Sequence, residues 1–194
     1  MKNKPFRILV AAAAIVLVSG CSLKTQNLSL DPKIDVAPAQ VAAGTLIGLS
    51  VTDARQTQKL GEVGDPNNKM VDVLLTEDFS PKLYAKLKAA LIEKGFEVVP
   101  SSEAMTRALR ISVVRLELSS VKTAFNFETE LRAEVSASAR NDRETYDRLF
   151  YVRSYKETAL PPFRKDSNAL VNTAVSQALE DILSDQKMLQ MLAR

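Results

Sequence analysis

Residues 127–140 alternate between core-type and water-type side chains, and this pattern restricts the fold more than any other feature of the chain. The odd positions carry Phe127, Thr129, Leu131, Ala133, Val135, Ala137 and Ala139, and the even positions carry Glu128, Glu130, Arg132, Glu134, Ser136, Ser138 and Arg140. A period of two is that of a β-strand with one face on a core and the other in water. The sequence therefore predicts a long strand here, followed by a turn at 141–144 and a second strand at 145–156. The small inward alanines leave room for a helix.

Two segments have the 3.6-residue period of amphipathic helices. The first is predicted to begin at Ser80, a good N-cap residue, with Pro81 in the first turn, and to end at Gly95. The second covers 167–183, where apolar residues form a single stripe, and a short terminal turn follows at 185–192.

The remaining strands are shorter and are separated by turn residues. We predict them at 45–52, 70–75, 96–99 and 109–121, with a long loop over 53–69 because that stretch carries two glycines and an Asp-Pro-Asn-Asn cluster. Together, these elements predict an α+β fold: an antiparallel or mixed sheet of five to six strands with two main amphipathic helices on one face.

Two positions predict local irregularities within these strands. Gly48 interrupts an apolar strand, which is typical of a bulge or of close approach by another part of the chain. The alternation in 109–121 changes phase at Val113 and Val114, so we expect a β-bulge there.

The first twenty residues have the pattern of a bacterial secretion signal. Three cations, Lys2, Lys4 and Arg7, precede an apolar run over 8–18 that is too short for a bilayer core needing about 20 residues. The run ends in Ser19-Gly20-Cys21, and Cys21 is the only cysteine of the chain.

The sequence Val18-Ser19-Gly20-Cys21 resembles the lipobox of bacterial lipoproteins, in which the cysteine is acylated and becomes the new amino terminus. Leu is commoner than Val at the first of these positions, and the alternative is an ordinary cleaved signal with an incidental cysteine. Ser22 resembles the sorting signal for the outer membrane. We therefore expect Cys21 to carry a lipid anchor in the periplasmic leaflet of that membrane.

These features divide the chain into three parts. Residues 1–20 are a signal peptide that is cleaved, 21–44 are the lipidated cysteine and a polar tether, and 45–194 form a single periplasmic α+β domain. The alternation of Ile34 and Val36 indicates that part of the tether docks as an extended segment.

Composition excludes several classes of function. Removal of residues 1–20 leaves 23 basic and 23 acidic side chains, so the mature chain gives no electrostatic reason to expect nucleic acid as a partner. The chain has no histidine, and lipidation uses its single thiol. Triads, Cys-His pairs and imidazole or thiolate metal sites are therefore excluded, and we expect no cofactor, no metal and no enzymatic activity.

Asp53 and Arg55 are the candidate binding residues, because they follow a strand and precede a long glycine-containing loop. The alternative, which the commonness of such pairs favours, is a turn hydrogen bond and an ion pair with no ligand. Glu128, Glu130 and Glu134 share one strand face and imitate a catalytic carboxylate pair, but the interleaved Arg132 is more typical of a solvated face with ion pairs.

The chain resembles the YajG-like lipoproteins of Gram-negative bacteria. The resemblance covers most of the chain and rests on the lipobox, the strand 46–52 running into Asp53-Ala54-Arg55, Leu60-Gly61, the helix-Gly-strand unit over 87–98, the long hairpin and the helix 168–182. It implies a location and a fold; the members of this family are biochemically uncharacterised, and none of these features is a catalytic signature.

We therefore expect an outer-membrane lipoprotein that acts as a non-enzymatic binding module for a cell-envelope partner, either a protein or peptidoglycan. Two alternatives remain open. A carboxylate-dependent cell-wall enzyme predicts a close acidic pair in a cleft, and a carrier of lipid or another apolar ligand predicts an apolar cavity between helix and sheet.

Overall fold

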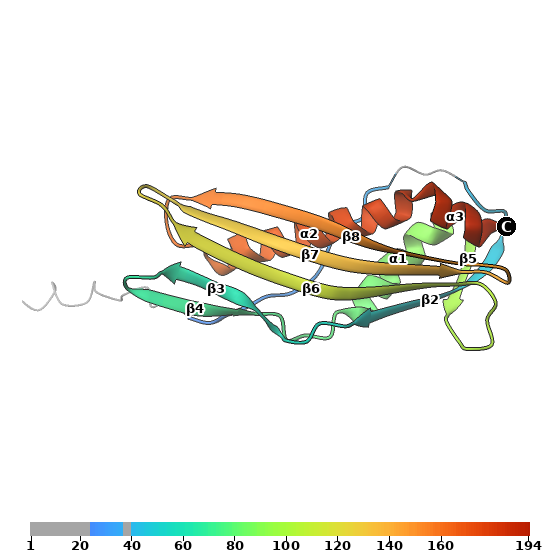
Figure 1. Cartoon of the computed structure of the whole chain (residues 1–194), viewed down its shortest axis with the longest axis horizontal. Coiled ribbons are helices and arrows are strands. Elements are labelled where there is room, and N and C mark those ends of the chain that lie inside the picture. Colours follow the sequence, from blue (N-terminus) through green and yellow to red (C-terminus); the bar gives the residue numbers. More distant parts are fainter. Residues whose placement is uncertain (1–23, 37–39) are drawn as a thin grey trace, which may run out of the picture.

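A computed structural model describes residues 24–36 and 40–194, so the signal peptide and Cys21 lie outside the described residues (Figure 1). In chain order the elements are β1 (Gln26–Asn27), β2 (Thr45–Asp53), β3 (Lys59–Asp65), β4 (Lys69–Leu74), α1 (Ser80–Glu93), β5 (Phe96–Pro100), β6 (Ala108–Lys122), β7 (Phe127–Arg140), β8 (Thr145–Thr158), α2 (Arg164–Ser184) and α3 (Gln186–Ala193). The fold is α+β, as expected, and the described residues form eight strands and three helices in place of the five to six strands and two helices of the prediction.

The long strand β6 organises the sheet. On one side it pairs along its length with β7, which pairs with β8, both antiparallel. On the other side, its first half pairs with β2, and its second half meets β3 at Leu118. β5 extends the sheet beyond β2, and β4 and β1 extend it beyond β3. The β2 and β3 branches therefore lie end to end along the same side of β6 (Figure 1).

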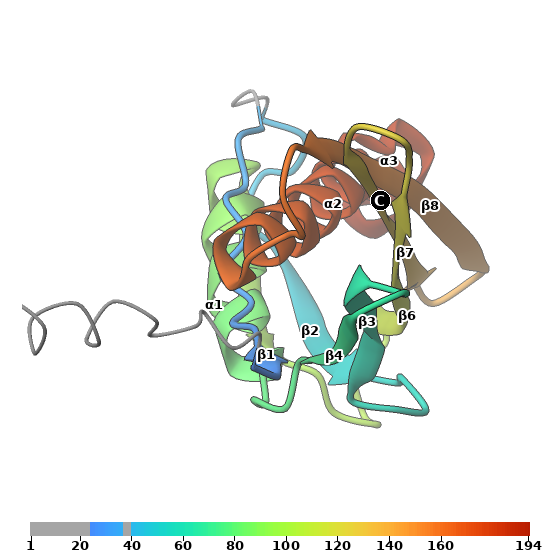
Figure 2. The same ribbon diagram turned by 90° about the vertical axis from the view of Figure 1, so that its left-hand side faces the viewer.

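The helices cover one face of this sheet (Figure 2). α2 packs on β7 and β8, whereas α1 packs on β2 and β5. The inward side chains of β7 from Leu131 to Ala139 are fully buried, as are Leu83, Leu87 and Leu91 of α1. Each large apolar side chain buried in this way contributes about 1.5 to 3 kcal/mol, so the interface between helices and sheet is the main source of stability.

Both predicted strand irregularities are confirmed. The register between β6 and β7 shifts between Val113 and Arg115, which is the expected bulge. Gly48 lies where the backbone of Ser101 approaches β2, and a Cβ at this position would be 2.9 Å from Cα of Ser101. The glycine therefore permits close approach of the segment that follows β5.

The predicted loop over 53–69 is wrong, because β3 forms inside it and pairs with β4. The glycines that suggested a loop are needed for the strand. A Cβ on Gly61 would lie 1.8 Å from the carbonyl oxygen of Leu118, and one on Gly64 would lie 2.1 Å from that of Lys69. These close approaches depend on residues far along the chain or across the hairpin, so local composition could not reveal them.

The N-terminal ends of the helices differ from the prediction, whereas α1 ends before Gly95 as expected. Phe79 occupies the N-cap of α1, and the Ser80 N–H donates to Asp78 Oδ1 at 3.0 Å, so an aspartate supplies the acceptor expected from the serine. α2 begins three residues earlier than predicted, where the Phe163 N–H donates to Asp166 Oδ2 at 3.0 Å. The terminal turn is the full helix α3.

The described part of the predicted tether is packed against the domain, which corrects the expected boundary at residue 45. β1 pairs in parallel with β4, and Leu28 and Leu30 are buried in the core. The partial docking indicated by Ile34 and Val36 is confirmed, because both pack against the core cluster. We call residues 24–36 the strap. The apolar side chains that it buries explain why it does not extend into solvent.

Candidate functional site

The junction between the two branches of the sheet forms a cleft. β2 leaves β6 after Asp53 pairs with Val113, and β3 joins it where Gly61 pairs with Leu118. Between these two points, Arg115, Leu116 and Glu117 of β6 pair with β7 alone, and Val114 is left out of the pairing at the bulge. The cleft has a volume of about 480 Å³ and is lined by 54–57, 59–61 and 114–117. The bulge at Val113 and the gap between the branches thus coincide.

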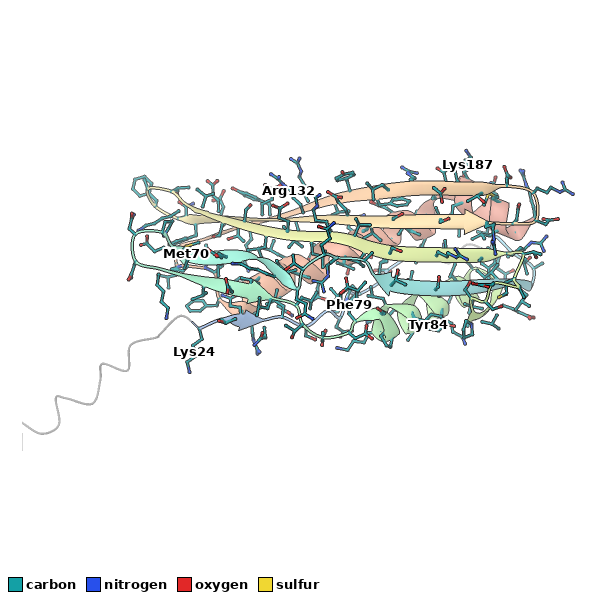
Figure 3. The ribbon with its side chains drawn as sticks, turned by 60° about the horizontal axis from the view of Figure 1, so that its bottom comes forward. Lys24, Met70, Phe79, Tyr84, Arg132 and Lys187 are labelled. Carbon is teal, nitrogen blue, oxygen red and sulfur yellow. The ribbon has the colours of Figure 1, made fainter. Side chains whose placement is uncertain are left out.

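Asp53 and Arg55 lie at the edge of this cleft and bind each other. Arg55 Nε donates to Asp53 Oδ1 at 2.8 Å and Nη2 donates to Oδ2 at 2.7 Å, which is the bidentate geometry of a strong ion pair. Nη2 also donates to the carbonyl of Leu75 at 3.1 Å, and the guanidinium lies 5.0 Å from the ring centroid of Phe79. Phe79 lies near the middle of the long molecule (Figure 3).

These contacts make Arg55 a structural clamp. Only 4% of its side chain is exposed, and it joins the end of β2 to the segment that leads from β4 into α1. Burial alone would raise the pKa of Asp53, but hydrogen bonds from the side chain and backbone N–H of Arg55 outweigh that effect and hold this pKa below its usual value. The pair therefore has the turn and ion-pair arrangement that was the alternative to ligand binding.

The other charges of the cleft are partly neutralised. Lys59 pairs with Glu62 at 2.6 Å and with Asp72 at 2.7 Å, and Arg115 lies 3.5 Å from Glu134. Glu117 is the one carboxylate among the lining residues. A single carboxylate surrounded by cations does not provide the acid and base pair of a glycosidase.

The three glutamates of β7 lie on its outer face, as predicted. Glu130 binds Arg132 at 2.9 Å and lies 3.6 Å from Arg153, whereas Glu134 faces Arg115. The hydrogen bond from Arg132 lowers the pKa of Glu130. A carboxylate held in its charged form is a poor general acid, so these residues match the ion-paired face that the interleaved arginine indicated.

The outer face of β8 carries exposed apolar and aromatic side chains. Leu149, Tyr151 and Tyr155 point to solvent, whereas Phe150 is buried against the helix side. Phe150 and Tyr151 therefore lie on opposite faces, as the alternation predicts. This outer face is the uncovered face of the sheet (Figure 2).

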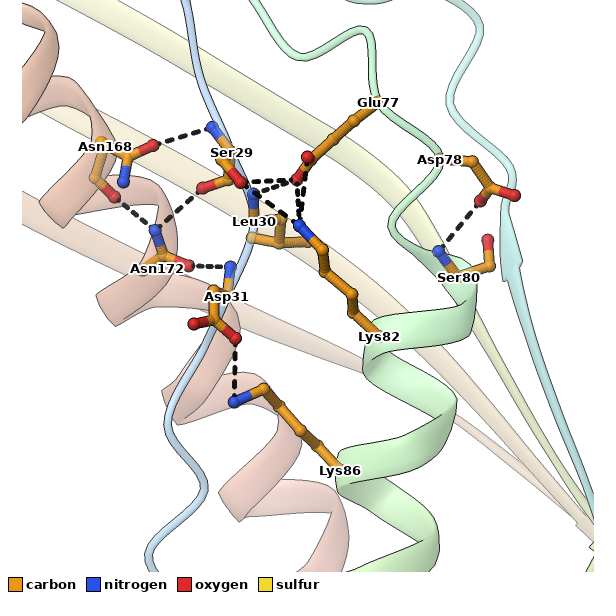
Figure 4. Close-up of polar contacts among 10 residues, drawn as sticks. All are labelled: Ser29, Leu30, Asp31, Glu77, Asp78, Ser80, Lys82, Lys86, Asn168 and Asn172. Carbon is orange, nitrogen blue, oxygen red and sulfur yellow. Dashed lines mark hydrogen bonds and ion pairs between the residues drawn. The ribbon is translucent and has the colours of Figure 1, made fainter.

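Polar side chains of α1, α2 and the segment before α1 hold the strap in place, as Figure 4 shows. Asn168 Oδ1 accepts from the Ser29 N–H at 2.9 Å, and Asn172 Oδ1 accepts from the Asp31 N–H at 2.6 Å. Glu77 Oε1 accepts from the Leu30 N–H at 2.6 Å. From Ser29 to Asp31, the backbone N–H groups of the strap thus donate to side chains and not to a neighbouring strand.

These hydrogen bonds between the helices and the strap were not predicted from the sequence. Two asparagines four residues apart within a predicted helix were the available signal, because asparagine is a poor helix former that usually serves a side-chain hydrogen bond. The alternation of Leu28 and Leu30 was the second signal. Neither shows which segment is the partner.

None of the described helices is both long and apolar enough to span a membrane. The described residues also contain no cluster of three or more acidic, cysteine or histidine side chains suited to a metal ion.

Comparison with solved structures shows a shared fold. Protein XCC0632 from Xanthomonas campestris, of the family DUF330, is 14% identical with a TM-score of 0.51; the match covers 87% of this chain and 96% of that one. A Helicobacter pylori protein described as a neuraminyllactose-binding hemagglutinin homolog is 9% identical with a TM-score of 0.48, over 79% of this chain and 91% of that one. At 14% identity, the likeness to the Xanthomonas protein shows a shared fold alone. No curated protein matches the chain.

A family model described as "Uncharacterized lipoprotein" (Lipoprotein_16) matches residues 32–193, from within the strap to the end of α3. The match covers most of the chain and confirms the resemblance to the YajG-like lipoproteins. The chain therefore belongs to this family of uncharacterized lipoproteins.

Proposed function

We propose that the protein is a lipoprotein anchored through Cys21 in the periplasmic leaflet of the outer membrane, where it acts as a non-enzymatic binding module for an envelope partner. Family membership supports a membrane-anchored location. The partner is a protein or peptidoglycan, and the uncovered face of the sheet is the surface that meets it.

One observation carries this proposal: the outer face of β6 to β8 is open over strands of 14 or 15 residues. Leu149, Tyr151 and Tyr155 are exposed there beside the charged pairs of Glu130 with Arg132 and Arg153. Aromatic side chains next to arginine are typical of binding surfaces, because they offer a large contact area at low entropic cost.

The electrostatics support a role in binding over one in catalysis. In the described part of the chain, every acidic side chain with a clearly shifted pKa is shifted downwards: Asp31, Asp53, Asp65, Glu77, Glu130, Asp166 and Asp185. A general acid working near neutral pH needs a raised pKa. These carboxylates are instead held in their charged form by hydrogen bonds and ion pairs.

The packing of α2 favours a binding module over a lipid carrier. The alanines of β7 are fully buried where α2 packs on this strand. Ala174, Ala178 and Leu179 of the apolar stripe of α2 are fully buried as well. None of the residues that line the cleft beside Arg55 belongs to a helix, so this cleft is not a cavity between helix and sheet.

Site-specific photocrosslinking in living cells tests the proposal. A photoreactive amino acid replaces Tyr151 on the open face, and the matched control replaces Ala89, an exposed position on α1. We expect a discrete adduct, either a protein or a glycan, from position 151 and none from position 89. Loss of the adduct in a Cys21→Ser background would show that binding requires the anchor. Equal labelling at the two positions, or no adduct at 151, would contradict a partner on the open face.

A further inference from the structure

We propose that the end of the domain formed by three turns, at 65–68, 123–126 and 159–163, rests in the lipid surface that holds the anchor. We call this surface the turn end. The inference rests on the proposed anchoring at Cys21, and it adds a second, non-covalent contact between the folded domain and the membrane.

The chain enters the folded domain at the turn end. β1 runs parallel to β4, with Gln26 opposite Val73, so Thr25 and Lys24 lead back along β4 toward the turn at 65–68. Lys24 and Met70 line the same surface groove, and Figure 3 shows both at this end of the molecule. Cys21 is only three residues before Lys24, a span of at most about 11 Å for an extended chain.

Because the strap is fixed to the domain, it gives the domain less freedom to move away from the anchor than a flexible tether would. Gln26 Nε2 donates to the Pro162 carbonyl at 2.8 Å, and Gln26 Oε1 accepts from Ser167 Oγ at 2.7 Å. The Leu28 N–H donates to the carbonyl of Leu74 at 2.8 Å. Because residues from Gln26 onward are fixed to the domain, an acylated Cys21 holds the turn end within a few residues' reach of the bilayer.

The three turns form one connected surface. Lys122 pairs with Asp65, which joins the turn between β6 and β7 to the turn between β3 and β4. Asn126 Nδ2 donates to Glu157 Oε2 at 3.1 Å, which joins it to the end of β8. The contact of Gln26 with Pro162 adds the loop before α2.

Apolar side chains project from this surface. Val121 is 60% exposed, Phe125 is 91% exposed, Leu160 is 62% exposed and Phe163 is 53% exposed. These are four of the six most exposed large apolar side chains in the described residues; the other two are Tyr151 and Tyr155 of β8. Exposed apolar groups gathered at one end of a domain indicate an interaction site, and phenylalanine and leucine are side chains that enter the boundary between headgroups and acyl chains.

The charges around these side chains suit a surface with anionic headgroups. Lys24, Lys69, Arg164 and Lys165 are exposed at this end. Two of the acidic groups nearby have cationic partners, since Asp65 binds Lys122 and Asp166 binds Lys156 at 2.7 Å, whereas Glu157 accepts from Asn126. Apolar side chains surrounded by free cations are the combination that attracts a domain to an anionic bilayer. The short reach to Cys21 favours lipid over a protein as the occupant of this surface.

Lipid contact can be measured on the full acylated protein in vesicles of phosphatidylethanolamine and phosphatidylglycerol. Acylation leaves no free thiol, so a Phe125→Cys variant offers one site for an environment-sensitive fluorophore. Ile92→Cys is the matched control, because Ile92 is 50% exposed at the C-terminal end of α1, away from the three turns. We expect the emission of the label at 125 to shift to the blue and to be largely quenched by quenchers attached to the acyl chains. The emission of the label at 92 should not change.

Each outcome separates the contact from the anchor. If both labels remain in water while the protein floats with the vesicles, the turn end does not touch lipid, although the anchor stands. If the label at 125 is shielded only after a second protein is added, the surface binds protein and the lipid contact is wrong. If the mature protein carries no acyl chain by mass spectrometry and does not float, the proposed anchoring itself fails. A Leu160→Cys variant repeats the measurement in case substitution at 125 disturbs the turn.

Discussion

The two faces of β7 show how differently neighbouring residues contribute to this protein. Leu131 is fully buried under the helices, whereas Arg132, the next residue, lies in water and binds Glu130 at 2.9 Å. The inner face fills the core and tolerates little change, because each buried side chain contacts several others in a dense interior. The outer face carries charges on β7 and tyrosines on the neighbouring β8, and replacing these side chains leaves the core intact. The surface free to acquire binding specificity is thus the one that contributes least to stability.

The largest expected effect is on the inner face. Leu131→Ala should lower the free energy of unfolding by about 3 kcal/mol, since it removes a buried side chain and leaves a cavity. The neighbouring variant, Arg132→Ala, should have a much smaller effect, because the ion pair that it breaks is exposed to solvent. Urea unfolding followed by circular dichroism measures both. Similar losses for the two variants would contradict the division between the faces.

A smaller effect is expected for the strap, where polar contacts, not apolar ones, hold the backbone. Asn172→Ala removes hydrogen bonds to the Asp31 N–H and the Ser29 carbonyl, so we expect a loss of about 1 to 2 kcal/mol and faster cleavage of the strap by protease. Gln177→Ala is the control, because Gln177 is exposed and its amide donates to Asp181 of its own helix and not to the strap. Unchanged protection of residues 24–36 in the Asn172 variant would show that the buried leucines suffice to hold the strap.

The smallest expected effect depends on pH and arises at the end of α2. Burial opposes ionisation of Asp185, but hydrogen bonds from the Met188 N–H and Arg148 outweigh it and lower its pKa. Because the folded-state pKa lies below that of the unfolded chain, this stabilisation is present above about pH 4 and is lost as the pH falls through the folded-state value.

Asp185→Asn should therefore reduce stability at pH 7 by about 1 kcal/mol and make it fall less steeply on acidification. Thermal unfolding at pH 7 and at pH 3 measures both quantities. If the variant and the wild type lose the same amount of stability between pH 7 and pH 3, the acid sensitivity arises from other carboxylates, such as Asp53 and Asp166.

The parts of the fold that could be predicted are those with a clear local period. The alternation over 127–140 identified β7, and the phase change at Val113 located the bulge in β6. The apolar stripes identified α1 and α2, although the N-cap of α1 is Phe79 and not Ser80, and α2 begins three residues earlier than predicted. For the candidate site, the spacing of Asp53 and Arg55 predicted their mutual contact, but the burial of Arg55 under the Leu75 carbonyl and the Phe79 ring depends on segments distant in sequence.

By itself, the sequence determined the strands and helices whose side chains repeat at two or 3.6 residues, because those periods arise from backbone geometry within each segment. It also determined the exclusion of histidine and free-thiol chemistry from the mature chain, given acylation at Cys21. Only the tertiary structure decided that β3 forms around Gly61, that the strap packs on α2, and that the exposed residues of three turns share one end. Each of these features requires a partner far away in the chain, and pairing between distant segments leaves no period in either of them.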